Sequence, residues 1–221
     1  DSARLYENMQ QQRQTAHEMG AQFVPEWSAY YPALLSHLEH PPPLLHALGD
    51  LDLLNHQPPT VAIVGARACT AYGREQAKLF GKSMAFAQET IISGAARGID
   101  MISMQASVNA GGKVIAVLGS GLDVCYPREA FQMLEQIIAQ GGLVLSEFSF
   151  TTRPLAQSHH CSIVTGFICH SSHAQIGHDE HNRLGIEVGQ RNLRPTWPHR
   201  RSCLLWHQLA DSRGRHPRFK P

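Results

Sequence analysis

The sequence predicts an α/β protein built on a parallel sheet, and three observations carry that prediction. Between residues 60 and 148, short apolar segments alternate with longer segments whose apolar residues recur at helical spacing. Three consecutive apolar segments each open into a stretch that contains glycine, beginning near Gly65, Gly94 and Gly119. Short strands that alternate with helices favour right-handed strand–helix–strand units. We therefore predict a Rossmann-like parallel sheet with flanking helices.

The individual elements follow from local sequence signals. Residues 1–20 are rich in glutamine and end in Gly20, which predicts a helix with a glycine stop. A connector follows, with a short amphipathic helix at 31–35 and a chain break at the prolines of 41–43. The core is predicted to hold strands near 61–65, 90–93, 114–118 and 143–146 and helices near 71–88, 98–110 and 129–140.

The chain divides into three predicted parts. Residues 1–57 form an N-terminal helical extension and connector, residues 58–155 the Rossmann-like core, and residues 156–221 a degenerate or poorly ordered basic part, incomplete or irregular in fold. In the last part the pattern is weak: 162–167 fits a helix start or a strand, and 182–189 fits a helix.

Charge separates the same regions. Residues 1–150 hold 9 Lys and Arg against 14 Asp and Glu, whereas residues 151–221 hold 10 against 4. The net charges are therefore −5 and +6. A basic tail can bind nucleic acid, but poorly ordered sequence with incidental charge explains the same composition, and both interpretations stay open.

Composition limits the class of protein. With 221 residues and 43% hydrophobic residues, the chain can bury one sizeable core. Its apolar runs are all shorter than the roughly 20 residues needed to span a bilayer, so we expect a cytoplasmic protein with no membrane partner. Five cysteines without CxxC spacing favour reduced thiols over disulfides or structural zinc. Because the chain opens on Asp1, we expect that an N-terminal portion precedes it.

The segment 93–100 is the best candidate for binding an anion. It stands between an apolar run and a helix-like segment, and Gly94 and Gly98 allow the backbone to approach a ligand closely. The helix start offers N–H groups and Arg97 adds a planar cation. Ligands of open α/β sheets lie beyond the carboxyl ends of the strands, so Arg67 is expected in the same crevice.

These considerations define a predicted phosphate-binding set. A small-residue turn between strand and helix also occurs for packing reasons alone, and Lys113 and Arg128, which flank the third loop, also fit plain surface positions. The predicted set comprises Gly65, Arg67, Ser93, Gly94, Arg97, Gly98, Lys113, Gly119, Ser120, Gly121 and Arg128.

Several motifs in fixed order resemble one known family, the DNA-processing protein A family, also called DprA or Smf. The resemblance runs from about residue 31 to 147. Its carriers are YPALL at 31–35, HPPPLLHALGDLDLL at 40–54, VAIVGARACTAYG at 61–73, SGAARGID at 93–100, GGKVIAVLGSGLDVCYPRE at 111–129 and SE at 146–147.

The resemblance implies a function without enzymatic chemistry. Members of the family are Rossmann-like proteins that bind single-stranded DNA, self-associate as homodimers, and help to load a RecA-type recombinase during natural transformation. It therefore implies a DNA-binding protein of competence and recombination, with no catalytic residues and no cofactor. By the same resemblance, Arg67, Ser93, Gly94, Arg97 and Gly98 match the pocket that holds DNA phosphates.

The chain departs from the family pattern at several places. Met104 stands where the family has a histidine, and Ala130 where it has an asparagine. After about residue 155 the family has a basic FPxRNRI segment, of which residues 158–166 keep only the end, and then an apolar strand, which this chain does not resemble. Our hypothesis is that a reading-frame shift altered this part and impaired DNA binding.

A rival interpretation is a Rossmann-like nucleotide hydrolase of the phosphoribohydrolase type. Asp100, Asp123 and Glu147 lie near predicted strand ends, where catalytic carboxylates would stand. Those hydrolases have a GGxGT-type loop followed closely by a glutamate, which is missing after Gly121. The histidines between 159 and 181 have the spacing of metal ligands but no helix to align them, so no metal site is predicted.

Overall fold

The computed structural model describes residues 2–33, 35–55, 60–154, 173–178 and 184–189. The predicted element at 162–167, and the tail from residue 190, lie outside the described residues. So does most of the segment in which we expect a frame shift. None of the helices in the described ranges combines the length and the apolar character that a membrane span requires.

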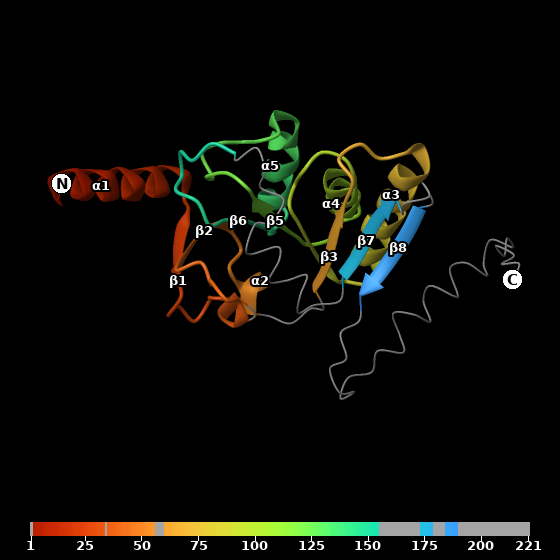
Figure 1. The fold of residues 1–221 in the computed structure, drawn as a ribbon, viewed down its shortest axis with the longest axis horizontal. Coiled ribbons are helices and arrows are strands. Elements are labelled where there is room, and N and C mark those ends of the chain that lie inside the picture. Colours follow the sequence, from red (N-terminus) through yellow and green to blue (C-terminus); the bar gives the residue numbers. More distant parts are fainter. Residues whose placement is uncertain (1, 34, 56–59, 155–172, 179–183, 190–221) are drawn as a thin grey trace, which may run out of the picture. The chain divides into compact units, whose positions relative to one another are not determined.

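The first quarter of the chain holds a long helix and two strands (Figure 1). Helix α1 covers Ser2–Met19 and ends at Gly20, whose φ of 68° is the left-handed conformation typical of a residue that ends a helix. Strand β1 (Gln22–Pro25), a 3-10 turn (Leu35–His37), strand β2 (Leu44–Gly49) and the short helix α2 (Asp52–Asn55) follow.

The central part repeats strand and helix as predicted (Figure 1). It contains β3 (Thr60–Gly65), α3 (Ala71–Phe86), β4 (Thr90–Ser93), α4 (Ile99–Asn109), β5 (Val114–Leu118), a 3-10 turn (Arg128–Ala130), α5 (Phe131–Ala139) and β6 (Leu143–Ser146). Within the described residues, β7 (His173–His178) and β8 (Leu184–Gly189) complete the chain order.

In the described part of the chain, eight strands form one sheet in the order β1-β2-β6-β5-β4-β3-β7-β8. Strands β3, β4, β5, β6 and β7 are parallel to their neighbours in that group. The β1/β2, β2/β6 and β7/β8 pairs are antiparallel. The α/β class and the mostly parallel sheet predicted from the sequence are confirmed.

Three local expectations need correction. The connector supplies β1 and β2, which add two strands to the sheet that the sequence did not predict. The helix expected at 31–35 is replaced by the 3-10 turn at Leu35–His37. The helix expected at 182–189 is wrong, because Leu184–Gly189 is strand β8. Its apolar residues alternate with Gly185, Glu187 and Gly189, a period of two that suits a strand.

Both faces of the sheet are covered at strands β3 to β6. Ile91 and Ile92 are adjacent in β4 and fully buried, yet they belong to different apolar clusters. Successive side chains of a strand point to opposite faces, so the sheet separates two cores. Residues of α3, α4 and α5 pack on the face of Ile91, and Tyr31, Leu35 and Leu51 on the face of Ile92. Burial on both sides explains why β3 to β6 are largely continuous apolar runs.

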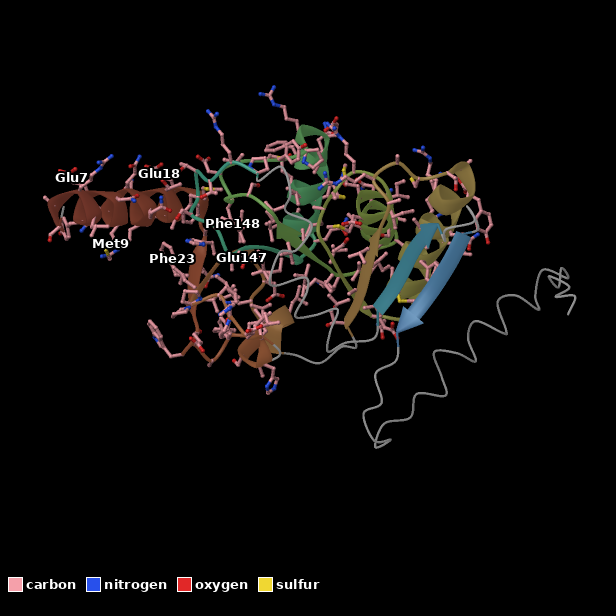
Figure 2. The ribbon with its side chains drawn as sticks, viewed as in Figure 1. Glu7, Met9, Glu18, Phe23, Glu147 and Phe148 are labelled. Carbon is pink, nitrogen blue, oxygen red and sulfur yellow. The ribbon has the colours of Figure 1, made fainter. Side chains whose placement is uncertain are left out.

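Helix α1 is joined to the core at its C-terminal end. Ala16 is buried, and the Gln12 Oε1 atom accepts a hydrogen bond from the Phe150 N–H at 3.1 Å. Figure 2 shows Glu7, Met9 and Glu18 along α1 and Phe23 on the strand that follows it. The same view shows Glu147 and Phe148 in the segment after β6.

Candidate nucleic-acid interface

The loops that follow β3, β4 and β5 lie at one edge of the sheet. These strands are neighbours and parallel, with Ala62 paired to Ile92 and Ile92 paired to Ile115. Their carboxyl ends therefore point the same way. Gly65 ends β3, and the loops after β4 and β5 begin at Gly94 and Gly119, so the three glycines stand at the strand ends as the sequence predicted.

Gly98 holds the first two loops in direct contact. A Cβ atom at this position would lie 2.2 Å from the Ala66 carbonyl oxygen and 2.6 Å from the Arg67 carbonyl oxygen. The φ of Gly98 is 88°, a conformation that favours glycine. Next to it, the Ile99 N–H donates to the Ala66 oxygen at 3.3 Å. The loops that carry Arg67 and Arg97 are thus pressed together, backbone against backbone.

A buried carboxylate lies beneath these two loops. Asp100, in the first turn of α4, is 5% exposed, and its Oδ1 atom accepts a hydrogen bond from the Gly65 N–H at 3.1 Å. Burial raises the pKa of Asp100 to about 6, although the backbone N–H groups of Gly65, Ala96 and Gly94 oppose this by favouring the charged form.

This arrangement changes what the loops can offer a phosphate. The Gly65 N–H points to Asp100 and is not available to an anion. Ser93 is fully buried, and its hydroxyl donates to the Ile63 carbonyl at 2.6 Å. Gly65 and Ser93 were predicted to contact phosphate, but their hydrogen bonds are made inside the protein, where they hold the loops in place. The exposed cations are the arginine side chains.

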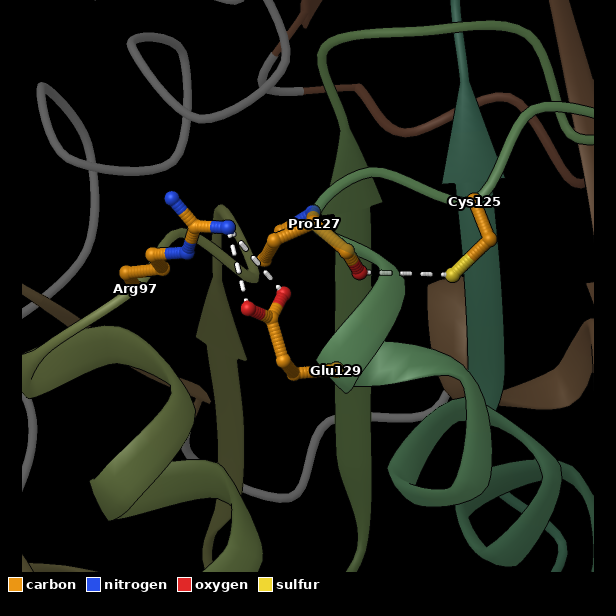
Figure 3. Close-up of polar contacts among 4 residues, drawn as sticks. All are labelled: Arg97, Cys125, Pro127 and Glu129. Carbon is orange, nitrogen blue, oxygen red and sulfur yellow. Dashed lines mark hydrogen bonds and ion pairs between the residues drawn. The ribbon is translucent and has the colours of Figure 1, made fainter.

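Arg97 forms an ion pair that the sequence analysis missed (Figure 3). Its Nη2 atom lies 3.0 and 3.3 Å from the two carboxylate oxygens of Glu129, and both side chains are more than half exposed. The backbone N–H of Glu129 and the charge of Arg97 lower the pKa of this carboxyl. The two residues are 32 positions apart, and the only sequence signal was an acidic residue beside the third loop.

The segment before Glu129 is held by a thiol contact. The Cys125 Sγ atom lies 3.5 Å from the Pro127 carbonyl oxygen, as Figure 3 shows. Burial raises the pKa of the Cys125 thiol, with a further contribution from the charge of Glu129. A protonated thiol is a hydrogen-bond donor, so this contact helps to fix the approach to Glu129.

The third loop is mostly packed inside the protein. The Ser120 hydroxyl donates to the Val124 carbonyl at 2.7 Å, and the Ser120 carbonyl accepts from the Ser146 hydroxyl at 2.7 Å. A Cβ atom on Gly121 would lie 2.1 Å from the carbonyl oxygens of Ser149 and Phe150. Ser120 and Gly121 are buried, and Gly119 is partly buried. Their position is that of packing residues.

The two flanking cations lie at opposite edges. Lys113 precedes β5, and its Nζ atom donates to the carbonyls of Gln140 and Gly141 at 2.7 and 3.1 Å. It therefore binds the C-terminal end of α5 at the amino edge of the sheet. Arg128 is exposed in the turn that leads into α5, at the carboxyl edge. The structure brings Arg67, Arg97 and Arg128 to one edge, which we call the arginine edge, and leaves Lys113 away from it.

The three carboxylates on which the rival hydrolase interpretation depends differ in how deeply they are buried. Asp100 is enclosed by the loops, Asp123 is exposed and Glu147 is partly buried. Among the residues whose side chains the structure describes, no group of three or more His, Cys, Asp or Glu could hold a metal ion. The histidine clusters of the sequence analysis lie outside that part of the chain.

Fold and site together define a Rossmann-like α/β protein whose sheet carries cationic loops at the carboxyl ends of its strands. The model of one family, DNA recombination-mediator protein A, matches residues 22–161. The chain therefore belongs to the DNA recombination-mediator protein A family, the family that its motifs predicted.

Individual relatives agree with this assignment. The chain is 39% identical over 135 residues to protein Smf of Synechocystis sp., which covers 60% of this chain and 34% of the relative. It is 42% identical over 125 residues to DNA processing protein DprA of Streptococcus pneumoniae, covering 57% and 43%. The chain thus spans less than half the length of either relative.

Two solved structures share the fold. The crystal structure of DNA processing protein A from Streptococcus pneumoniae matches with a TM-score of 0.61 and 33% identity, over 75% of this chain and 55% of that one. A structure of DNA processing protein A from Helicobacter pylori, described for its single-stranded DNA binding mode, matches with a TM-score of 0.60 and 28% identity, over 72% and 68%.

Proposed function

We propose that this chain binds single-stranded DNA at the arginine edge and acts in DNA processing. The observation that carries the proposal is the contact of Gly98 with the carbonyls of Ala66 and Arg67, which holds two arginine loops together beyond the strand ends. The same assignment is supported by the Helicobacter pylori relative, whose structure is described for its mode of binding single-stranded DNA.

The chemistry of the edge suits a phosphate backbone. Binding without sequence preference needs cations along a track, and Arg67, Arg97 and Arg128 supply three exposed guanidinium groups. Arginine forms bidentate hydrogen bonds with phosphate, whereas an exposed ion pair such as Arg97–Glu129 is weak. A DNA phosphate can therefore replace Glu129 as the partner of Arg97. Tyr126, half exposed in the same loop as Arg128, offers a ring face for base stacking.

The wider role rests on the family. The family description as a recombination mediator supports a RecA-type recombinase as partner, and we propose a homodimer that assists recombinase loading during natural transformation, without enzymatic activity of its own. Such partners imply action in the cytoplasm. The part after residue 155 lacks the basic segment of the family pattern, so we propose weaker DNA binding than in the relatives.

The test is fluorescence anisotropy of a labelled oligothymidine at low and moderate salt. The native chain should bind in a salt-sensitive manner, and Arg97→Ala should weaken binding and lower the salt slope by about one. Arg13→Ala, which removes the same charge from an exposed position on α1, is the matched control. Circular dichroism should show that all three chains are folded. Equal affinity of Arg97→Ala and the native chain would move the binding site away from the arginine edge.

A further inference from the structure

We propose that Asp100 is a positioning residue for DNA binding, which sets the relative placement of the loops that carry Arg67 and Arg97. This inference rests on the proposed function. It goes beyond that function because Asp100 itself touches no DNA: the side chain is buried beneath the loops.

Asp100 joins three separate pieces of chain. Its own position is the first turn of α4, and its Oδ1 atom binds the N–H of Gly65 at the end of β3. Its Oδ2 atom lies 3.2 Å from the place where Gly94 would carry a Cβ atom, so the loop after β4 passes directly over the carboxylate. One side chain therefore defines how far the first loop stands from the second.

The loop over Asp100 is held in an unfavourable conformation. Ala95 is completely buried and has a φ of 51°, which residues other than glycine adopt at an energetic cost. The backbone N–H groups of its neighbours Gly94 and Ala96 favour the charged form of Asp100, and the Gly94 side of the strained residue lies directly against the carboxylate. Such conformations persist only where the surroundings over-determine them, and here the carboxylate supplies that restraint.

Charge alone would argue against a carboxylate at this place. A negative charge beneath a surface that binds phosphate repels the ligand, and its burial carries a desolvation penalty. Simple electrostatics therefore predicts that removal of the charge tightens DNA binding. The positioning role predicts the opposite, and this difference in sign makes the proposal testable.

The decisive variant is Asp100→Asn, with Asp123→Asn as matched control. Asparagine has nearly the same shape but one acceptor oxygen, and its amide would turn donors toward the N–H groups that face Asp100. Asp123 is exposed in the loop after β5, so its replacement removes an equal charge without entering the buried contacts.

Two readouts separate positioning from general stability: affinity for labelled oligothymidine, and amide hydrogen exchange at Gly65, Gly94 and Ala96. We expect Asp100→Asn to weaken binding on the order of tenfold, because the displaced loops would lose one well-placed contact between an arginine and a phosphate. The variant should also speed hydrogen exchange at these amides. Asp123→Asn should bind as tightly as the native chain or more tightly.

An Asp100→Asn chain that is folded and binds as tightly as the native chain overturns the proposal. If that variant does not fold, Gly94→Ala disturbs the same contact from the loop side, because its new Cβ atom would lie 3.2 Å from the Asp100 Oδ2 atom, and it should weaken binding and speed amide exchange at Gly65. Unchanged affinity of folded Gly94→Ala likewise overturns the proposal. If the native chain binds no DNA, the proposed function fails by itself, and unchanged amide exchange in Asp100→Asn then refutes the positioning of the loops separately.

Discussion

Replacement of Gly98 by alanine tests the contact that assembles the arginine edge. The backbone of Gly98, at φ 88° and ψ −131°, lies in a region that is nearly restricted to glycine, and alanine there costs about 1–3 kcal/mol. The new Cβ atom would also overlap the carbonyl oxygens of Ala66 and Arg67, at 2.2 and 2.6 Å. Overpacking of this kind costs about 1–3 kcal/mol more.

The expected loss of stability is therefore about 2–6 kcal/mol, a large part of the roughly 5–15 kcal/mol that stabilises a typical domain. Urea unfolding followed by circular dichroism measures it as a change of midpoint at constant slope. The same variant should bind oligothymidine more weakly where it remains folded, because the added atom forces the loops of Arg67 and Arg97 apart.

Gly111→Ala is the matched control. Gly111 has a similar positive φ of 78°, but a Cβ atom there would meet nothing within 4 Å. It should lose only the conformational contribution, about 1–2 kcal/mol. If Gly98→Ala destabilises the chain no more than Gly111→Ala, the two loops do not contact each other at Gly98. That result would also refute the geometry proposed for the arginine edge.

Three further predictions concern other parts of the molecule. Glu129→Gln should bind oligothymidine several-fold more tightly by anisotropy, because the substitution frees Arg97 from its ion pair. The control Glu135→Gln, an equal change at an exposed position of α5, should have a smaller effect. Equal effects of the two substitutions would show that the ion pair does not compete with DNA. Burial lowers the pKa of His46 below its usual 6.5, so the unfolded chain binds the proton more readily and stability falls as pH drops below about 6.5. His46→Leu should show a smaller drop in urea midpoint between pH 7 and 5 than the native chain, and an identical drop would rule out His46 as the cause. Gly121→Ala should lose about 1–3 kcal/mol, because its Cβ atom would strike the carbonyls of Ser149 and Phe150, and an unchanged urea midpoint would contradict this packing.

The parallel core was predictable because its signals are local. Continuous apolar runs and helical periodicity over residues 60–148 placed β3 to β6 and the helices between them to within a few residues. Strands β1 and β2 were not predicted. Strand β2 becomes a strand by pairing with β6, about 100 positions later in the chain, and a pairing of that kind leaves little trace in the segment itself.

The candidate site was only partly predictable. Arg67 and Arg97 follow from the rule that loops after parallel strands share one edge. Lys113 and Gly119 flank the same strand, β5, yet the strand carries them to opposite edges of the sheet, since each residue advances the chain by about 3.3 Å. Proximity in sequence to the third loop was therefore a poor guide to the place of Lys113.

The sequence by itself determined the order of strands and helices between residues 60 and 148, the glycine-containing loops and the family, because each depends on residues close together in the chain. Only the tertiary structure decided that two loops come into contact at Gly98, that Asp100 lies beneath them and that Glu129 pairs with Arg97. The physical reason is that these contacts depend on which strands become neighbours in the sheet and on what each loop then covers, and no local periodicity specifies either.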